Sequence, residues 1–600
     1  MTTSDSSRLS RRSLLRSMTA LAGGAALSHQ AMGSAQAAMS DLPKGFGKGR
    51  TVAVIGGGMA GLTAGWKLAN AGFKVTIYEA DSRYGGRSLT VRPDEAGNNG
   101  TPYKKWWFDK YNPERLFPAM YVSRYKEDSR SPDPVEQVCH FKDVTWKPGN
   151  GSPVELFLNA GPGRIPSDHT ELLKLCGKIG VALEPYIFQS NYNLLRSKKF
   201  NNGTPVAYNQ INYSLKGEIA ATLAKFTEAS CAAGQGNNDL MGAMLKEFGD
   251  LDAKCDYKGS VRLGYSELPG GWNTPGTVKA KVPLDKVLES GFVAGGDPEL
   301  TPGSFLFNAD NILWQNSLMQ PVGGMDRIWQ RLLVQEIPLD SVNPRASDPR
   351  LPGLQRRDEQ RRSRGQNPIR YVGDLVLLNH RATGIRQIPG GDKIYIETNG
   401  SHTEKADFCI STMAPNLLAR ILQGVSEGFL PALAKVQQVP AIKVGWQAKS
   451  RFWESEDHIY GGISWTDDDI GQIWYPSEDF NAPTGVLTGA YNRGPTALTF
   501  SQLSQTARID NALNGGQNLH PCFADKVYAD KGVTIAWHFM PFQVGGWSAL
   551  TAKLDPETYN TIIKPQGRLY LAGDAYSYLP GWLEGAVTSV QKAIGALPPA

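Results

Sequence analysis

The sequence predicts an α/β fold, α+β overall, built around a discontinuous Rossmann-like domain that binds FAD or NAD(P). An apolar run typical of a buried strand, residues 51–55, leads directly into a glycine-rich turn and then a helical pattern. The turn contains Gly56, Gly58 and Gly61. A second apolar run, residues 74–78, ends at the acidic residue Glu79. Together these features form the βαβ unit that binds a dinucleotide.

Each part of this unit has its own physical role. Gly56 permits the tight turn, Gly58 lets the backbone approach a pyrophosphate, and Gly61 lets the helix pack closely against the strand. The helix N-terminus offers free N–H groups and the positive end of its dipole to phosphates. Glu79 is placed to accept hydrogen bonds from ribose hydroxyls, and its charge disfavours a 2′-phosphate. The alternative is a glycine-rich turn in some other α/β fold.

A second glycine-rich element follows Glu79 and consists of Gly85, Gly86 and Arg87. Its backbone and guanidinium can approach the same pyrophosphate from the other side. NAD enzymes do not usually carry this second clamp. The chain here resembles the flavin amine oxidase family, and within it the bacterial FAD-dependent L-amino-acid oxidases, which are related to amino-acid 2-monooxygenases. The resemblance implies FAD as the cofactor.

Two C-terminal segments extend the resemblance. Residues 567–574 look like the family's closing FAD motif, in which a strand ends at Gly573 and Asp574 meets the ribityl or pyrophosphate region. The next segment opens a last helix, and the resemblance places three of its residues at the flavin: Gly581, Trp582 and Leu583. The positive end of that helix dipole would favour an anionic reduced flavin.

The composition describes a large globular protein. Its net charge of +6 is spread over 600 residues, and no basic stripe interleaved with aromatic residues indicates nucleic acid. The six cysteines lack C-x-x-C spacing, which argues against a metal site or a disulfide framework and leaves one or two disulfides open. Because no cysteine follows Cys522, we expect FAD to be bound non-covalently, unlike in some monoamine oxidases.

The N-terminus has the features of an export signal. Arg11 and Arg12 precede a weakly apolar stretch, residues 18–27, and residues 35–37 form an Ala-x-Ala cleavage site. Residues 1–37 therefore resemble a twin-arginine signal peptide, and its apolar stretch is too short for stable membrane insertion. We expect export to the periplasm or the extracellular space. This route moves folded proteins, which suits an enzyme that acquires FAD in the cytoplasm.

The remaining chain is predicted to form three interleaved parts. The FAD-binding domain takes residues 50–92, 318–438 and 532–600. The mixed-sheet substrate-binding domain takes residues 93–190, of which 93–150 are an insertion, and 439–531. A mainly helical subdomain takes residues 191–317. Residues 344–370, rich in arginine, proline and glycine, are predicted to form a mobile solvated loop that a protease could cut.

Residues 159–169 carry the strongest indication of the substrate. They resemble the Gly-Pro-x-Arg-x-Pro segment of L-amino-acid oxidases, which implies that Gly163 and Arg164 lie at the FAD and that Arg164 binds the substrate α-carboxylate. A carboxylate that enters a desolvated pocket needs a permanently charged, bidentate partner, and arginine provides it. The alternative is an arginine in a surface turn.

Further residues are assigned by the same resemblance. Tyr475 matches an aromatic-Tyr-Pro segment and would bind the other carboxylate oxygen; the alternative is a strand tyrosine in the core. The Gly581 carbonyl would accept a hydrogen bond from the substrate amine, and Trp582 would wall the pocket. Trp537 resembles a tryptophan beside the flavin ring. The strand around Val376 could hold the adenine with its backbone.

Lys443 lies in an otherwise apolar strand and matches a family lysine that holds a water near flavin N5. An unpaired ammonium there would be costly, and burial would shift its pKa in a direction useful for dioxygen activation. The alternative is an outward-facing lysine on an edge strand. No residue is required to act as a base, because the substrate ammonium can lose its proton to solvent.

The sequence therefore predicts an exported FAD-dependent L-amino-acid oxidase in which Lys443, Arg164 and Tyr475 are catalytic. It would convert an L-amino acid and dioxygen to a 2-oxo acid, ammonia and hydrogen peroxide. An amino-acid 2-monooxygenase and an amine or polyamine oxidase remain alternatives. A non-catalytic scaffold is a remote one, because it would not need intact cofactor motifs. The preferred side chain and a homodimer both stay open.

Overall fold

The computed structural model describes residues 41–91, 140–141, 156–232, 240–267, 276–291, 318–342, 344, 348–400, 402–529, 532–540, 542–550 and 555–599. The predicted signal peptide, and all of the 93–150 insertion except strand β4, lie outside the described residues. Within the described part, no helix combines the length and apolar character needed to cross a membrane.

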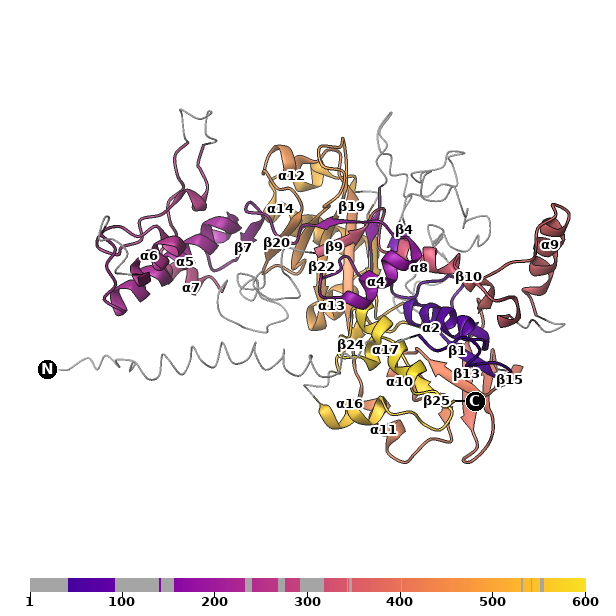
Figure 1. Ribbon diagram of the computed structural model, residues 1–600. Coiled ribbons are helices and arrows are strands. Elements are labelled where there is room, and N and C mark those ends of the chain that lie inside the picture. Colours follow the sequence, from indigo (N-terminus) through magenta and orange to yellow (C-terminus); the bar gives the residue numbers. More distant parts are fainter. Residues whose placement is uncertain are drawn as a thin grey trace.

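A five-stranded parallel sheet in the order β12-β2-β1-β16-β25 forms the dinucleotide-binding core. Its strands are β1 (Thr51–Ile55), β2 (Lys74–Tyr78), β12 (Val376–Leu377), β16 (Phe408–Ser411) and β25 (Leu569–Leu571). Helix α2 (Met59–Asn70) packs against α17 (Leu583–Gly595), so the first helix and the last helix of the described residues meet beside this sheet (Figure 1). The predicted βαβ unit is confirmed.

Smaller elements surround this core. A four-stranded sheet in the order β15-β14-β13-β17 combines β13 (Ala382–Gln387), β14 (Ile394–Thr398), β15 (His402–Ala406) and β17 (Leu422–Gln423). Two-stranded sheets pair β3 (Thr90–Val91) with β5 (Leu158–Asn159), β6 (Leu183–Tyr186) with β9 (Leu318–Pro321), β10 (Glu336–Ile337) with β11 (Arg370–Tyr371), and β18 (Gln438–Val439) with β24 (Trp547–Ser548). The helices here are α4 (Thr170–Ile179), α8 (Arg327–Leu333), α10 (Pro415–Leu418), α11 (Phe429–Lys435) and α16 (Pro556–Ile562).

An eight-stranded mixed sheet, in the order β4-β23-β19-β22-β21-β20-β7-β8, forms the second large layer. Its strands are β4 (His140–Phe141), β7 (Leu194–Arg196), β8 (Val206–Ala207), β19 (Ala441–Gln447), β20 (Gly462–Thr466), β21 (Gln472–Tyr475), β22 (Val486–Arg493) and β23 (Val533–Ala536). The helices α12 (Phe452–Ser455), α13 (Gly494–Ser501), α14 (Gln505–Leu519) and α15 (Phe523–Lys526) accompany it. This sheet crosses two predicted boundaries, because β23 falls in the 532–600 segment and β7 and β8 fall in the 191–317 segment. Strand pairing over such distances leaves no local signal.

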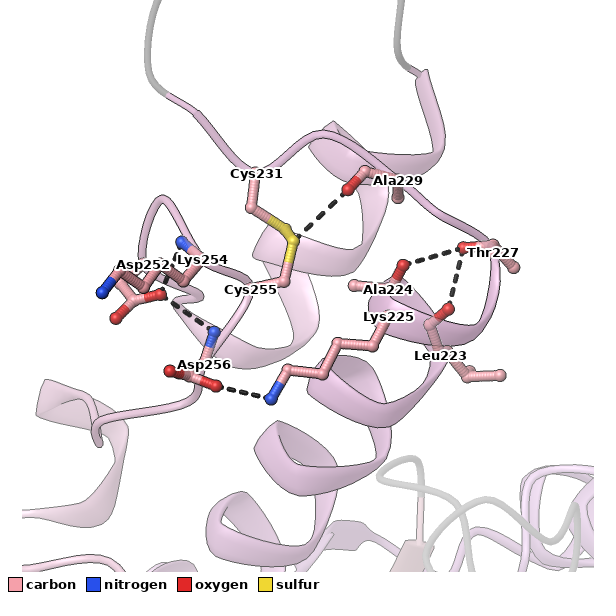
Figure 2. The surroundings of a disulfide bond; sticks show 10 residues. All are labelled: Leu223, Ala224, Lys225, Thr227, Ala229, Cys231, Asp252, Lys254, Cys255 and Asp256. Carbon is pink, nitrogen blue, oxygen red and sulfur yellow. Dashed lines mark hydrogen bonds and ion pairs between the residues drawn. A yellow bond between two sulfur atoms is a disulfide. The ribbon is translucent and has the colours of Figure 1, made fainter.

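Three helices stand away from the two sheets on one side of the molecule (Figure 1): α5 (Tyr208–Phe226), α6 (Leu240–Gly249) and α7 (Leu284–Glu289). A disulfide between Cys231 and Cys255 joins the segment after α5 to the segment after α6, and Figure 2 shows it beside the end of α5. The ion pair between Lys225 and Asp256, at 2.5 Å, also connects α5 to the segment after α6. The other described cysteines are free thiols.

Removing this disulfide with Cys231→Ala and Cys255→Ala is expected to lower the free energy of unfolding by about 2–4 kcal/mol. Neither cysteine lines the large cavity described below, so activity at low temperature should change little. Denaturant unfolding and limited proteolysis of the α5–α6 region measure the effect, with the buried free thiol variant Cys176→Ala as the control. Equal stability of the double variant and its parent would contradict the expectation.

The arginine-rich segment predicted as a mobile loop contains a helix of 12 residues, so that prediction was wrong. Helix α9 (Leu351–Arg362) lies at the edge of the molecule opposite to α5–α7 (Figure 1). Ion pairs attach it and its flanks: Arg350 to Asp348, Arg357 to Asp374, and Arg370 to Asp358. The helix is polar nearly all round, so apolar periodicity could not reveal it.

Candidate active site

A cavity of about 500 Å³ lies where the parallel sheet, helix α17 and the large mixed sheet meet. Most of the predicted cofactor and substrate residues line it: Gly56, Gly58, Glu79, Gly86, Arg87, Lys443, Trp537, Gly573, Asp574, Gly581, Trp582 and Leu583. These residues come from both ends and the middle of the sequence. The structure therefore brings together in one cavity the motifs that the sequence separates by hundreds of residues.

The glycine-rich turn has the shape that a pyrophosphate site requires. Gly56 and Gly86 have positive φ angles of 106° and 55°, which favour glycine. Gly58 caps helix α2 with no side-chain hydrogen bond, which leaves the first N–H groups of the helix to a ligand. Gly61 does not line the cavity; a Cβ there would stand 1.8 Å from the Gly56 carbonyl oxygen, so its role is packing.

Gly61→Ala is expected to abolish FAD retention, because the added methyl group displaces the turn that holds the pyrophosphate. The matched control is Gly177→Ala in helix α4, where a Cβ meets nothing within 4 Å. The flavin absorbance of each purified protein, relative to its absorbance at 280 nm, measures the difference. Full flavin content in the Gly61 variant would contradict the packing role.

Glu79 faces the cavity at the end of β2 and is 6% exposed. Its carboxylate accepts hydrogen bonds from the Gly57 N–H at 2.6 Å and from the Asp81 N–H at 2.8 Å. Burial raises its pKa, while these N–H groups act in the opposite direction. A carboxylate has about four acceptor positions, so Glu79 retains capacity for the two hydroxyls of a ribose.

Arg87 and Asp574 join the first and last FAD motifs by a direct ion pair. Arg87 Nη1 also donates to the Gly546 carbonyl at 2.9 Å, and the Gly581 N–H donates to Asp574 Oδ2 at 2.9 Å. The arginine side chain stays 30% exposed within the cavity. It is therefore held in place and still accessible to an anion such as a pyrophosphate.

Tryptophan side chains and a constrained glycine also line the cavity. Trp537 Nε1 donates to the Ala160 carbonyl at 2.8 Å, and the Trp582 ring meets the buried His169 ring edge-on at 4.9 Å. Gly581 has a φ of +82°, and a Cβ there would lie 3.1 Å from Trp547. Trp547 also lines the cavity.

Lys443 lies inside β19, which is paired on both sides by β22 and β23, so the edge-strand alternative is excluded. Its ammonium is buried and donates to the carbonyls of Asn159 at 2.8 Å and Gly161 at 2.7 Å. Desolvation, with a smaller contribution from the Arg164 charge, lowers the pKa of Lys443 to about 7. A lysine in this state changes charge near neutral pH.

The Arg164 guanidinium is surrounded by aromatic rings, so the surface-turn alternative does not hold. Its Cζ lies 4.9 Å from the Trp474 ring, 5.0 Å from Phe188 and 5.9 Å from Tyr186. Burial is the main cause that lowers its pKa. Arg164 is not a lining residue itself, but its neighbours Gly161 and Pro162 are. Gly163 packs against Trp474, where a Cβ would approach to 2.9 Å.

The prediction for Tyr475 was wrong, because the structure does not bring it to the cavity. Tyr475 is 1% exposed, and its hydroxyl lies 2.6 Å from His520 Nε2 and 2.7 Å from Ser464 Oγ. Adjacent residues of a strand point to opposite faces. Trp474 therefore faces Lys443, whose Nζ is 4.4 Å from its ring, and Tyr475 faces the core behind the sheet.

A different tyrosine, Tyr491, lies at the cavity and was missed. It stands directly opposite Lys443 in the pairing of β22 with β19, and its ring is 5.2 Å from the Lys443 ammonium. The register of two antiparallel strands would have found it, but register is not visible in one sequence.

The backbone role of Val376 at the adenine stays a prediction. Val376 pairs with Ile77 in the parallel sheet, its side chain is buried in the core, and it does not line the cavity. The nearby cavity wall comes instead from Arg381, Ala382 and Thr383.

In the described part of the chain, no group of three or more His, Cys, Asp or Glu residues could hold a metal ion.

Two family models match the chain. The model of flavin-containing amine oxidoreductases matches residues 365–593, and that of NAD(P)-binding Rossmann-like domains matches residues 54–115. An L-amino-acid oxidase of Siganus canaliculatus is 24% identical over 90% of this chain and 84% of its own length. A flavin-dependent L-tryptophan oxidase of Lentzea aerocolonigenes is 22% identical over 91% of this chain and 98% of its own length.

Solved structures with the same fold include a wild-type putrescine oxidase bound to putrescine, with a TM-score of 0.50 and 16% identity. Cyclohexylamine oxidase from Brevibacterium oxydans has a TM-score of 0.52 and 14% identity. In both cases the match covers 91% of this chain and 98% of the other. These matches confirm the predicted fold class.

Proposed function

We propose that this chain, which matches the family model of flavin-containing amine oxidoreductases over residues 365–593, is an exported, FAD-dependent L-amino-acid oxidase. It would convert an L-amino acid, dioxygen and water to a 2-oxo acid, ammonia and hydrogen peroxide. One observation carries this choice over an amine oxidase: Arg164 is a half-buried cation beside the cavity, and it packs on the same Trp474 ring as Lys443, at 4.9 Å and 4.4 Å respectively. An amine has no group that needs such a cation, whereas an amino acid has its carboxylate.

The residues of the cavity fit FAD and divide its binding between them. The glycine-rich turn and Arg87 would hold the pyrophosphate, Glu79 the ribose, and Asp574 the Arg87 side chain and the start of the last helix. We propose non-covalent binding. Bound FAD supplies a two-electron acceptor for the hydride of the substrate Cα and passes the electrons to dioxygen.

The chain's own residues would bind and orient the amino acid. Arg164 pairs with the α-carboxylate, and Tyr491 takes the role first expected of Tyr475, because it lines the cavity beside Lys443. The Gly581 carbonyl accepts a hydrogen bond from the neutral amine. Trp537 and Trp582 exclude water, and holding the reacting atoms in one geometry accounts for much of the rate.

The first test is a substrate panel on the flavin-loaded protein under air. The twenty L-amino acids, putrescine and cyclohexylamine are supplied one at a time, and peroxide, ammonia and carbon dioxide are measured together. Peroxide with ammonia and no early carbon dioxide from an L-amino acid supports the proposal. Carbon dioxide without matching peroxide indicates a monooxygenase, and turnover of amines alone indicates an amine oxidase.

Export is proposed from the twin arginines and is supported by the Cys231–Cys255 disulfide, because disulfides persist in oxidising compartments. Replacing Arg11 and Arg12 with lysine is expected to retain the protein in the cytoplasm with its N-terminal segment uncleaved. Fractionation and the mass of the mature protein measure this. Unchanged export of the Lys-Lys variant would contradict the twin-arginine route.

A further inference from the structure

We propose that Asp457, His520 and Tyr475 form a buried hydrogen-bonded chain that positions Trp474 from the face of the sheet opposite to the cavity. Trp474 in turn packs against the charged groups of Arg164 and Lys443, at 4.9 Å and 4.4 Å from its ring. The kinetic part of this proposal rests on the proposed function. The three residues are positioning residues, because none of them lines the cavity.

The chain of hydrogen bonds is continuous. Asp457 Oδ2 lies 2.9 Å from His520 Nδ1, and His520 Nε2 lies 2.6 Å from the Tyr475 hydroxyl. That hydroxyl donates to Ser464 Oγ at 2.7 Å, and Ser464 Oγ accepts from the Leu194 N–H at 2.8 Å. Three strands, β21, β20 and β7, are thereby tied together by side chains as well as by their ladders.

The His520 ring is held by packing as well as by hydrogen bonds. It is 0% exposed, and its neighbours are Phe452 at 5.3 Å, Tyr475 at 5.7 Å and Phe523 at 6.1 Å between ring centroids. A polar chain in such apolar surroundings is strong when every partner is present and costly when one is removed. Asp457, 28% exposed, therefore fixes the imidazole from the surface end.

Strand β21 carries the constraint across the sheet. Trp474 and Tyr475 are consecutive, so fixing one fixes the backbone from which the other projects to the opposite face. In the described pairing, β21 meets β22 at the single pair Trp474–Thr488. The backbone ladder between β21 and β22 is therefore short. The hydrogen-bonded chain of Asp457, His520 and Tyr475 restrains β21 where backbone pairing restrains it little.

Trp474 has little freedom to move without moving the site. Besides its contacts with Arg164 and Lys443, its ring meets Tyr491 edge-on at 5.1 Å. Gly163 leaves no room for a Cβ on its other side. A displacement of β21 at Tyr475 would thus be transmitted to the guanidinium of Arg164, which we assign to the substrate α-carboxylate.

The test compares Tyr475→Phe and Asp457→Asn, singly and together, with Thr484→Val as the matched control. Thr484 is also buried and hydrogen-bonded, to Gln447 at the end of β19 and to the Ala448 carbonyl, but it does not belong to the chain. The protein is labelled with 5-fluorotryptophan, and Trp474→Phe assigns one of the 14 tryptophan signals. This ¹⁹F signal reports Trp474 without any substrate.

We expect the Trp474 signal to shift in both chain variants but not in the control. KM for the oxidised L-amino acid should rise about three- to tenfold in each variant with a smaller change in kcat, and the double variant should be no worse than the worse single variant. A rise in KM for Tyr475→Phe with an unmoved Trp474 signal would make Tyr475 a direct ligand and overturn the proposal. An unmoved Trp474 signal together with an unchanged KM and a lowered melting temperature would also overturn the proposal, because the hydrogen-bonded chain would then only stabilise the fold. If no L-amino acid is oxidised, the proposed function fails while the ¹⁹F result still decides the positioning role.

Discussion

Arg164→Ala is expected to lower kcat/KM for the preferred L-amino acid by about 10²- to 10³-fold, mostly through KM. Truncating one partner of a buried charge pair costs about 2–5 kcal/mol, because the substrate carboxylate is left desolvated and unpaired. The measurement is steady-state peroxide production with the L-amino acid and with the corresponding amine that lacks the carboxylate. The amine should lose much less, so the preference for the amino acid should collapse.

Arg164→Lys provides the control, since it keeps a positive charge but not the bidentate geometry. An intermediate loss is expected. Flavin absorbance and melting temperature must match those of the parent for the comparison to be valid. Equal losses for the amino acid and the amine would contradict the carboxylate assignment, because they would indicate general damage to the cavity.

Lys443→Met is expected to lower kcat/KM for dioxygen by about 10²-fold below pH 7, the size of effect seen when one charged or hydrogen-bonding stabiliser is removed. The pKa of Lys443 is about 7, so the ammonium is charged below that pH and neutral above it. A cation stabilises the negative charge that develops on dioxygen. The rate with dioxygen in the parent should therefore fall as pH rises through 7, and this step should vanish in the variant.

Lys449→Met is the matched control, because Lys449 follows the same strand but is exposed and does not line the cavity. It should retain the pH step.

A second readout, the pH dependence of the free energy of unfolding, needs no turnover. The pKa of Lys443 is lowered on folding, so its contribution makes the protein less stable as pH falls from about 10.5 to about 7, with no further change below. Lys443→Met should remove this slope from the stability curve. A persistent pH step in the variant would assign it to another group.

The sequence determined the local parts of this protein. The βαβ unit, with Gly56, Gly58 and Gly61 and the acid Glu79, could be predicted because its steric demands fall on residues close together in the chain. Lys443 was singled out by its resemblance to a family lysine and by its place in an otherwise apolar strand, and its burial between β22 and β23 fits that role. Arg164 was singled out by its resemblance to a family motif, and its burial fits that role.

Tertiary structure alone decided how these parts face each other. Consecutive side chains of a strand point to opposite faces, so a shift of one residue separates Trp474, which packs against Arg164 and Lys443, from Tyr475 in the core. Tyr491 came to the site through its register with Lys443, and helix α9 formed through ion pairs instead of an apolar face. Register, strand order and ion pairing between distant segments depend on contacts that a single sequence does not encode locally, which is why only the folded chain decided them.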